Sequence, residues 1–378
     1  MDSKRNKSKV IIRYYYDRVS RDVGNFFKWI ALAVLTGLVV GGASSIFAGC
    51  IKWVTEYRNN NIWVFMLLPI VGVAIVFMYQ IIDPHDGGTN QVLSTIRSRG
   101  DVPLKAAPLI FVSTLLTHLT GGSAGREGAS IQFGGSIGNW LGKLVKLDEF
   151  DHHVMIMCGM SAAFAAVFGT PMAAAVFAME VVSVGVMYYA ALLPCVVASI
   201  IAAEFATGMG ISPETFSVTR IPALTVETGF KMAIISVGCA MVSIIFCIAL
   251  KFIAKIYGKY LKNLYVRVFV AGCVVIAITM ILNTKDYMGA GNELIARAIE
   301  TGQARPLDFL WKTILTAVTM RAGYRGGEIV PAFSVGATFG CVAGQLLGFQ
   351  PELAAAAGMV ALFCGVTNCP ITSMLISF

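Results

Sequence analysis

A glycine-rich stretch in the first half of the chain has the sequence Gly121-Gly122-Ser123-Ala124-Gly125-Arg126-Glu127-Gly128. A second such stretch, in the other half, has the sequence Gly323-Tyr324-Arg325-Gly326-Gly327-Glu328. Both hold a glutamate and lead into an apolar segment with glycine at every fourth position, at residues 134, 138 and 142 in one copy and 336, 340 and 344 in the other. This shared pattern indicates that the two halves of the chain are related.

A further match follows each stretch. Residues 159–164, Gly-Met-Ser-Ala-Ala-Phe, match residues 358–363, Gly-Met-Val-Ala-Leu-Phe, and Pro171 and Pro370 lie twelve residues after the respective glycines. Any one of these matches is weak, because glycine and alanine are abundant in packed membrane helices. All of them in the same order predict an internal duplication. Paired broken segments at corresponding positions of two halves indicate a transport site between the repeats.

The composition excludes a soluble globular protein and a disordered one. Of 378 residues, 57% are apolar and 13% are charged, against about 25% charged in ordinary soluble domains. A bilayer crossing takes about 20 mostly apolar residues, so the apolar runs leave room for roughly nine to twelve segments. Several runs are shorter and are interrupted by glycine or proline, as broken helices are, and such backbone must line a cavity or be buried in protein. We therefore predict an all-α, multi-pass protein of the cell membrane.

The chain divides into four parts in this interpretation. Residues 1–26 form a basic N-terminal segment, 27–205 a first transmembrane repeat, 206–228 a connection, and 229–378 a second transmembrane repeat. The first 21 residues hold seven basic and two acidic side chains. Beside an apolar segment, such a run is explained by the excess of positive charge on the cytoplasmic side, so we expect a cytoplasmic N-terminus and no nucleic-acid partner.

Metal and cofactor sites are not indicated. The nine cysteines fall almost entirely inside apolar runs and form no paired CxxC pattern, and the four histidines are scattered. We expect the cysteines to be small buried hydrophobic residues, and we expect no cofactor and no bound metal.

The two glycine-rich stretches have the chemistry of an anion site. A turn that opens a helix leaves several backbone N–H groups without intrahelical partners, and they point along the positive end of the helix dipole. Uncharged donors bind a halide without holding it as firmly as lysine or arginine would, and weak multi-point coordination suits conduction.

Glu127 stands at the start of such a helix, where its carboxylate competes with a transported anion for the same donors. Burial in an apolar environment favours the neutral form of a carboxyl group, so Glu127 can exchange a proton and leave the site. The alternative is a first-turn glutamate that only stabilises the helix dipole. Within a bilayer, ionisable groups are functional by default, which favours a gate and proton acceptor.

Residues 121–125 also match G-x-S-x-G, the nucleophile motif of serine hydrolases. That motif requires a preceding strand and a catalytic triad. The residues before Gly121 are instead typical of an apolar helix end. An intramembrane serine hydrolase built on Ser123 is therefore a remote alternative.

At these residues the chain resembles the CLC family of chloride channels and anion/proton antiporters. Residues 125–128, Gly-Arg-Glu-Gly, resemble the family's GREGP, with Ala129 in place of proline. Residues 168–173, Phe-Gly-Thr-Pro-Met-Ala, resemble the helix start that follows it, and residues 326–331, Gly-Gly-Glu-Ile-Val-Pro, resemble the GGxFxP loop. Residues 86–90, Asp-Gly-Gly-Thr-Asn, occupy the place of the GSGIP loop. The resemblance covers roughly residues 27–378.

The resemblance implies an inverted-repeat fold whose broken helices meet at an anion site near the membrane midplane. It also implies a homodimer in the lipid bilayer with one anion pathway per subunit. Glu127 is then the gating residue and proton acceptor. The implied anion-binding residues are Gly88, Thr89, Gly125, Arg126, Gly128, Gly327, Glu328, Ile329 and Val330.

The departures from the family pattern bear on the substrate. The family serine of GSGIP is replaced by either Gly88 or Thr89, and both alignments stay open. The second proton glutamate of family antiporters would stand at Val181, so Glu180 either substitutes for it on a proton path or only ends a helix. Glu328 stands where an apolar residue is usual. As a carboxylate it would repel a halide, whereas a protonated carboxyl group would donate a hydrogen bond.

This pattern is similar to the fluoride-exporting bacterial branch of the family. We therefore expect a proton-coupled antiporter that exports fluoride. The alternatives are a chloride/proton antiporter and a passive chloride channel. By the resemblance, the second repeat continues past Phe378 through further helices that include a tyrosine at the inner anion site, so we expect the chain as written to be a truncated product.

Overall fold

The computed structural model describes residues 2–97, 100–183, 185–213, 215–218, 222–223 and 225–377, with side chains from residue 16 onward. Its elements are helices, and within these residues there is no strand. The side chains of residues 1–15, which carry most of the predicted basic charge, lie outside the described residues. The predicted all-α fold is confirmed.

Two successive groups of helices make up the chain. The first group is α1 (Asp2–Asn60), α2 (Leu68–Ile82), α3 (Thr89–Arg97), α4 (Ala106–Leu119), α5 (Glu127–Leu144), α6 (Glu149–Phe168), α7 (Pro171–Glu180) and α8 (Leu192–Gly208), with short 3-10 turns before α2 and α8. The second group is α9 (Val226–Tyr260), α10 (Leu264–Leu282), α11 (Asn292–Glu300), α12 (Asp308–Ala322), α13 (Ile329–Leu346), α14 (Pro351–Thr367) and α15 (Pro370–Ile376).

The two groups share local geometry as well as sequence. The residues that precede α5 and α13 have nearly the same backbone angles, φ −113° and ψ −8° at Arg126 and φ −104° and ψ −4° at Glu328. Proline opens α7 and α15, and the residue before each proline has φ −117° and ψ 76° in both copies. The duplicated sequence therefore folds into duplicated turns and helix starts.

The glycine ladders let paired helices approach until their backbones touch. α5 crosses α6 so closely that a methyl group on Gly134 would overlap the carbonyl oxygen of Gly159. α13 crosses α14 in the same way at Gly336 and Gly358. The hydrophobic effect does not drive helices together within a membrane. Small residues at such crossings instead allow close backbone contact, and the resulting van der Waals packing holds the helices together.

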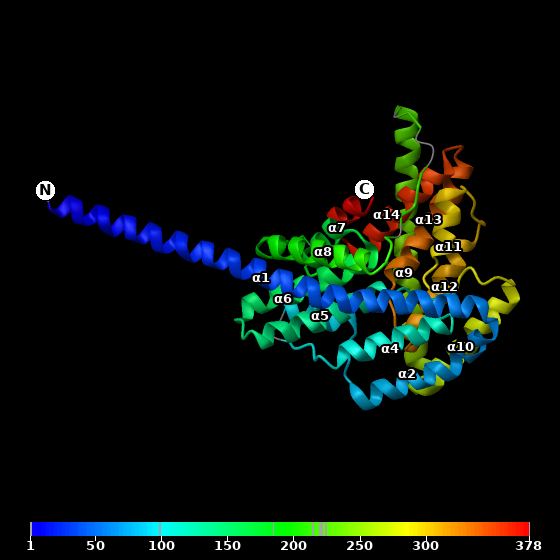
Figure 1. The fold of residues 1–378 in the computed structure, drawn as a ribbon. Coiled ribbons are helices and arrows are strands. Elements are labelled where there is room, and N and C mark those ends of the chain that lie inside the picture. Colours follow the sequence, from blue (N-terminus) through cyan, green and yellow to red (C-terminus); the bar gives the residue numbers. More distant parts are fainter. Residues whose placement is uncertain are drawn as a thin grey trace.

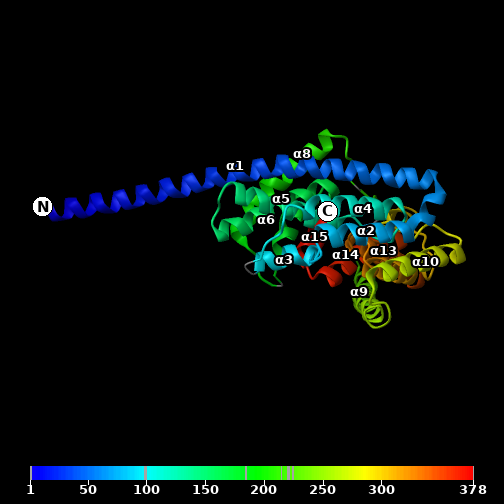
Figure 2. The ribbon, with the colours of Figure 1, turned by 90° about the horizontal axis from the view of Figure 1, so that it is seen from below.

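Seven of the described helical segments are long and apolar enough to cross a membrane, and α4, α7 and α14 are shorter apolar helices. Figure 1 shows α1 as a long rod whose N-terminal part projects from the body and whose remainder crosses the other helices. Figure 2 shows that α1 lies along one face, while α9 lies toward the opposite one. The first helix is longer than the apolar run from Phe27 to Cys50, because it continues to Asn60.

Candidate functional site

The two glycine-rich loops meet in the interior. The N–H of Gly125 donates to the carbonyl of Gly327 at 2.7 Å, and the N–H of Gly327 donates to the carbonyl of Gly125 at 2.7 Å. This reciprocal pair forms an isolated antiparallel bridge between the halves. It fixes the start of α5 against the start of α13, so the free N–H groups of both helix ends face a common region.

Glu127 lies in that region and is fully buried. One carboxylate oxygen accepts a hydrogen bond from the backbone N–H of Arg126 at 2.9 Å. The other accepts from the backbone N–H of Val330, in the first turn of α13, at 3.3 Å. The acidic side chain therefore binds to donors of both halves, in the manner expected of an anion at a helix N-terminus.

The loop before α3 approaches the same place. The hydroxyl of Thr89 donates to the carbonyl of Gly128 at 3.0 Å, which joins the start of α3 to the first turn of α5. Gly88 has a φ of +64°, a left-handed conformation in which a side chain is strained. Because the Thr89 hydroxyl already donates to protein and Gly88 has no side chain, neither residue offers an anion the free hydroxyl of a serine.

The remaining predicted residues divide between the buried site and its edge. Ile329 and Val330 are buried at the start of α13. The Arg126 side chain extends toward the carbonyl of Val167, at 3.5 Å, and borders a cavity. Glu328 is half-buried and forms an ion pair with Arg321 at 3.0 Å. The structure thus brings Gly125, Glu127, Gly128, Gly327 and Val330 together and turns the carboxylate of Glu328 toward a basic partner.

Glu180 lies at a different helix start. Its carboxylate accepts hydrogen bonds from the backbone N–H groups of Ile371 (3.1 Å) and Thr372 (2.9 Å) and from the Thr372 hydroxyl (2.7 Å). These donors belong to the first turn of α15, whose N–H groups have no intrahelical partners. Glu180 therefore caps a helix of the second half from the end of α7.

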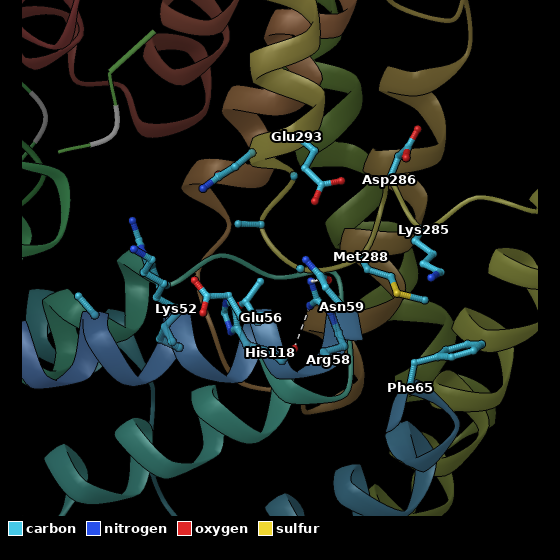
Figure 3. Close-up of a pocket in the computed structure, with 18 of the residues that line it drawn as sticks. Lys52, Glu56, Arg58, Asn59, Phe65, His118, Lys285, Asp286, Met288 and Glu293 are labelled. Atoms are coloured by element: carbon cyan, nitrogen blue, oxygen red, sulfur yellow. Dashed lines mark hydrogen bonds between the residues drawn. The ribbon is translucent and has the colours of Figure 1, made fainter. Parts of the chain in front are cut away.

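A cavity of about 590 Å³ lies between the C-terminal part of α1 and the connection from α10 to α11. Figure 3 shows Lys52, Glu56, Arg58 and Asn59 on one side of it and Lys285, Asp286, Met288 and Glu293 on the other. Arg58 donates to the carbonyl of His118 at 2.9 Å. Since Arg126 also borders this cavity, it leads toward the loop that holds Glu127.

Two polar groups that the sequence interpretation missed hold the loops in place. Lys312, on α12, is fully buried and donates to the Ser123 hydroxyl at 3.0 Å. Arg325, in the second glycine-rich loop, forms an ion pair with Asp86 at 2.9 Å and lies over the ring of Tyr79. A lone lysine within the apolar run from Leu307 to Thr319 is a signal that could have identified Lys312, because ionisable residues in membrane segments are rare and functional.

The environment of Ser123 disfavours a hydrolase. Helix α4, which ends at Leu119, precedes the loop, and a strand, which the nucleophile motif requires, does not occur among the described residues. Ser123 is 1% exposed, and its hydroxyl lies 3.1 Å from that of Thr316 and 3.0 Å from Lys312. A substrate carbonyl has no access to this oxygen.

Comparisons with known proteins agree on one family. The sequence profile of the family described as "Voltage gated chloride channel" matches residues 71–378. The "Chloride/fluoride channel protein" of Pseudomonas syringae is 32% identical over 93% of this chain and 79% of its own length. The "H(+)/Cl(-) exchange transporter ClcA" of Vibrio cholerae is 22% identical over 93% of this chain and 81% of its own. The crystal structure of a CLC-type fluoride/proton antiporter matches with a TM-score of 0.88 and 30% identity over 93% of this chain and 90% of that one.

Proposed function

The chain belongs to the family of voltage-gated chloride channels, and from this membership we propose that it exchanges fluoride for protons across a membrane. The observation that carries the proposal is the position of Glu127. Its carboxylate is fully buried and accepts hydrogen bonds from both halves of the chain. A group at that point can open the pathway only by moving away from donors that an anion would then use.

Proton coupling follows from the chemistry of that exchange. A deprotonated Glu127 is itself an anion and occupies the donors at the starts of α5 and α13. Protonation removes the charge that these donors stabilise, so the side chain leaves and a halide replaces it. Return of the carboxylate expels the halide and requires release of the proton. One proton therefore moves whenever Glu127 exchanges places with an anion.

Fluoride is the substrate that the site's donors favour. Fluoride is small and requires strong hydrogen-bond donors, and backbone N–H groups of two helix starts supply them. Neither Gly88 nor Thr89 offers a free hydroxyl like that of the serine in family chloride sites. Two relatives of 30% identity or more carry fluoride in their descriptions, which supports the same choice.

We further propose that the anion pathway is formed by Glu328 together with the backbone of Gly88, Thr89, Gly125, Arg126, Gly128, Gly327, Ile329 and Val330.

We also propose a homodimer in the bilayer with a cytoplasmic N-terminus. In this proposal the dimer covers apolar side chains on α7, α8 and α15, where Met172, Leu193 and Met374 are 51%, 44% and 64% exposed. An ion pair of Lys28 with Asp151, at 2.5 Å, joins α1, just after the basic N-terminal segment, to the start of α6.

Flux from proteoliposomes tests the substrate. Purified protein is reconstituted into vesicles loaded with equal concentrations of fluoride and chloride, and efflux of each is followed with an ion-selective electrode. We expect fluoride to leave faster than chloride. Faster chloride efflux would favour the chloride/proton antiporter, and passive, pH-independent chloride flux would favour the channel.

A further inference from the structure

Lys312 is a buried cation that the proposed exchange does not yet use. Its side chain is fully buried in α12. The Nζ atom donates to the Ser123 hydroxyl at 3.0 Å and to the carbonyls of Tyr287 and Gly289 at 3.0 and 2.7 Å. These acceptors satisfy the three N–H bonds of an ammonium group, but all of them are neutral. Among the described residues, Lys312 has no ion-pair partner.

The charges around Lys312 leave Glu127 as its counter-charge. The Glu127 carboxylate attracts the Lys312 ammonium, and Arg58 repels it. Arg126 adds a further basic group to the same region. Asp308, on the same helix as Lys312, is already paired with Arg297 at 2.9 Å and accepts from the Tyr287 hydroxyl at 2.6 Å. Glu293 faces Arg58 across the cavity wall.

The positive charge of Lys312 is stabilised when one negative charge lies nearby. A buried cation without an anion is costly in a low-dielectric interior, even when its hydrogen bonds are satisfied. Lys312 reaches the glycine-rich loop through Ser123, four residues before Glu127. The Glu127 carboxylate supplies this negative charge while it accepts hydrogen bonds from the N–H groups at the starts of α5 and α13. When Glu127 is protonated, that negative charge is lost.

We propose that Lys312, held by its three hydrogen bonds beside the first glycine-rich loop, supplies a buried positive charge that the Glu127 carboxylate and the transported halide neutralise in turn. This inference rests on the proposed exchange and adds a residue that determines its affinity and pH dependence. Lys312 touches neither the halide nor the proton. It acts through the electrostatic potential of its positive charge. When Glu127 is protonated and the site is empty, no negative charge balances Lys312, so a halide enters the site after protonation.

Removal of the charge has two expected effects with definite signs. Halide binding weakens, and the KM for halide rises by about tenfold, because a charge that attracts the anion within a low-dielectric interior is lost. The neutral form of Glu127 also becomes easier to reach, so protonation occurs at lower proton concentration. The pH at which transport is half-maximal therefore moves upward, by about one unit.

The test compares Lys312→Gln, which keeps hydrogen-bond donors, with Lys312→Arg, which keeps the charge, and with the control Gly229→Ala, at an uncrowded position in α9. Fluoride KM and the pH profile of flux are measured in proteoliposomes, after thermal unfolding in detergent has shown that each variant folds. We expect both shifts in Lys312→Gln and near wild-type values in Lys312→Arg and Gly229→Ala. An unchanged KM and pH profile in folded Lys312→Gln, or equal shifts in Lys312→Arg, would show a packing role and overturn the inference.

Two results separate this inference from the proposed function. If the wild-type protein moves no halide, the proposed exchange fails, whatever Lys312 does. If Lys312→Gln does not fold, Lys312→Arg decides. A wild-type KM and pH profile support the charge role, because arginine keeps the positive charge in a side chain of different shape, and displaced values contradict it.

Discussion

The Glu127 carboxylate, at the start of α5, accepts a hydrogen bond from the backbone N–H of Val330, at the start of α13, at 3.3 Å. One side chain of the first repeat thus occupies a donor of the second. Because the loops behind them are joined at Gly125 and Gly327, the two helix starts cannot separate without breaking that bridge. In the proposed exchange, the Glu127 side chain is therefore the part of the site that moves, and the backbone is the part that stays.

Substitution of Gly125 should displace the carboxylate. A methyl group on Gly125 would overlap the carboxyl group of Glu127. Relief of such an overlap is worth about 1–3 kcal/mol, so in Gly125→Ala we expect fluoride efflux at alkaline pH to rise at least about fivefold. Efflux is measured at several pH values. Gly229→Ala, in α9, is the control, because nothing lies within 4 Å of its added methyl group. A wild-type pH profile in Gly125→Ala would contradict the assigned position.

The glycine crossings should set the stability of each half. Gly134→Ala and Gly336→Ala place a methyl group against the carbonyl oxygens of Gly159 and Gly358. Overpacking of this kind costs about 1–3 kcal/mol, so we expect a lower Tm in detergent for both variants. Gly258→Ala, at an uncrowded position in α9, should unfold at or above the wild-type temperature. Equal melting of all three variants would refute this packing account.

Substitution of Glu180 should separate helix capping from proton transfer. Glu180→Ala leaves the N–H groups of Ile371 and Thr372 without acceptors, at a cost of about 1–3 kcal/mol. Glu180→Gln keeps one oxygen acceptor and should lose less stability. We expect Glu180→Gln to retain proton movement coupled to halide. A stable Glu180→Gln variant that moves fluoride without protons would place Glu180 on the proton path instead.

The proposed role of Glu328 in transport can be measured separately from folding, because its ion pair with Arg321 is partly exposed. The two side chains are 40% and 38% exposed, and such pairs contribute at most about 1 kcal/mol. We therefore expect Glu328→Gln to melt within a few degrees of wild type but to carry less fluoride. Arg321→Met removes the partner and keeps the carboxylate. Wild-type fluoride flux in Glu328→Gln would remove Glu328 from the pathway.

The sequence was sufficient for the helical membrane fold and for the two loops. Glycine-rich turns before apolar segments are local signals, because the free N–H groups and the following helix depend only on neighbouring residues. The repeat then predicted that the two loops would lie in contact, and they do so at the bridge between Gly125 and Gly327.

The partners of the side chains could not be predicted in this way. Glu180 caps α15, and Arg325 pairs with Asp86, across long sequence separations. Such contacts depend on how distant helices pack, which local patterns do not specify. Lys312 is an intermediate case, because its isolation in an apolar run was visible, but its contact with Ser123 required the fold.

Proton movement driven by a fluoride gradient tests the central claim most directly. Proteoliposomes with high internal fluoride and equal internal and external pH are opened to outward flux, while external fluoride and internal pH are recorded together and the membrane potential is clamped. Wild-type protein should take up protons as fluoride leaves, and Glu127→Gln should abolish the proton movement. Fluoride efflux from wild-type protein without proton uptake, or proton uptake that persists in Glu127→Gln, would contradict Glu127 as the exchanging group.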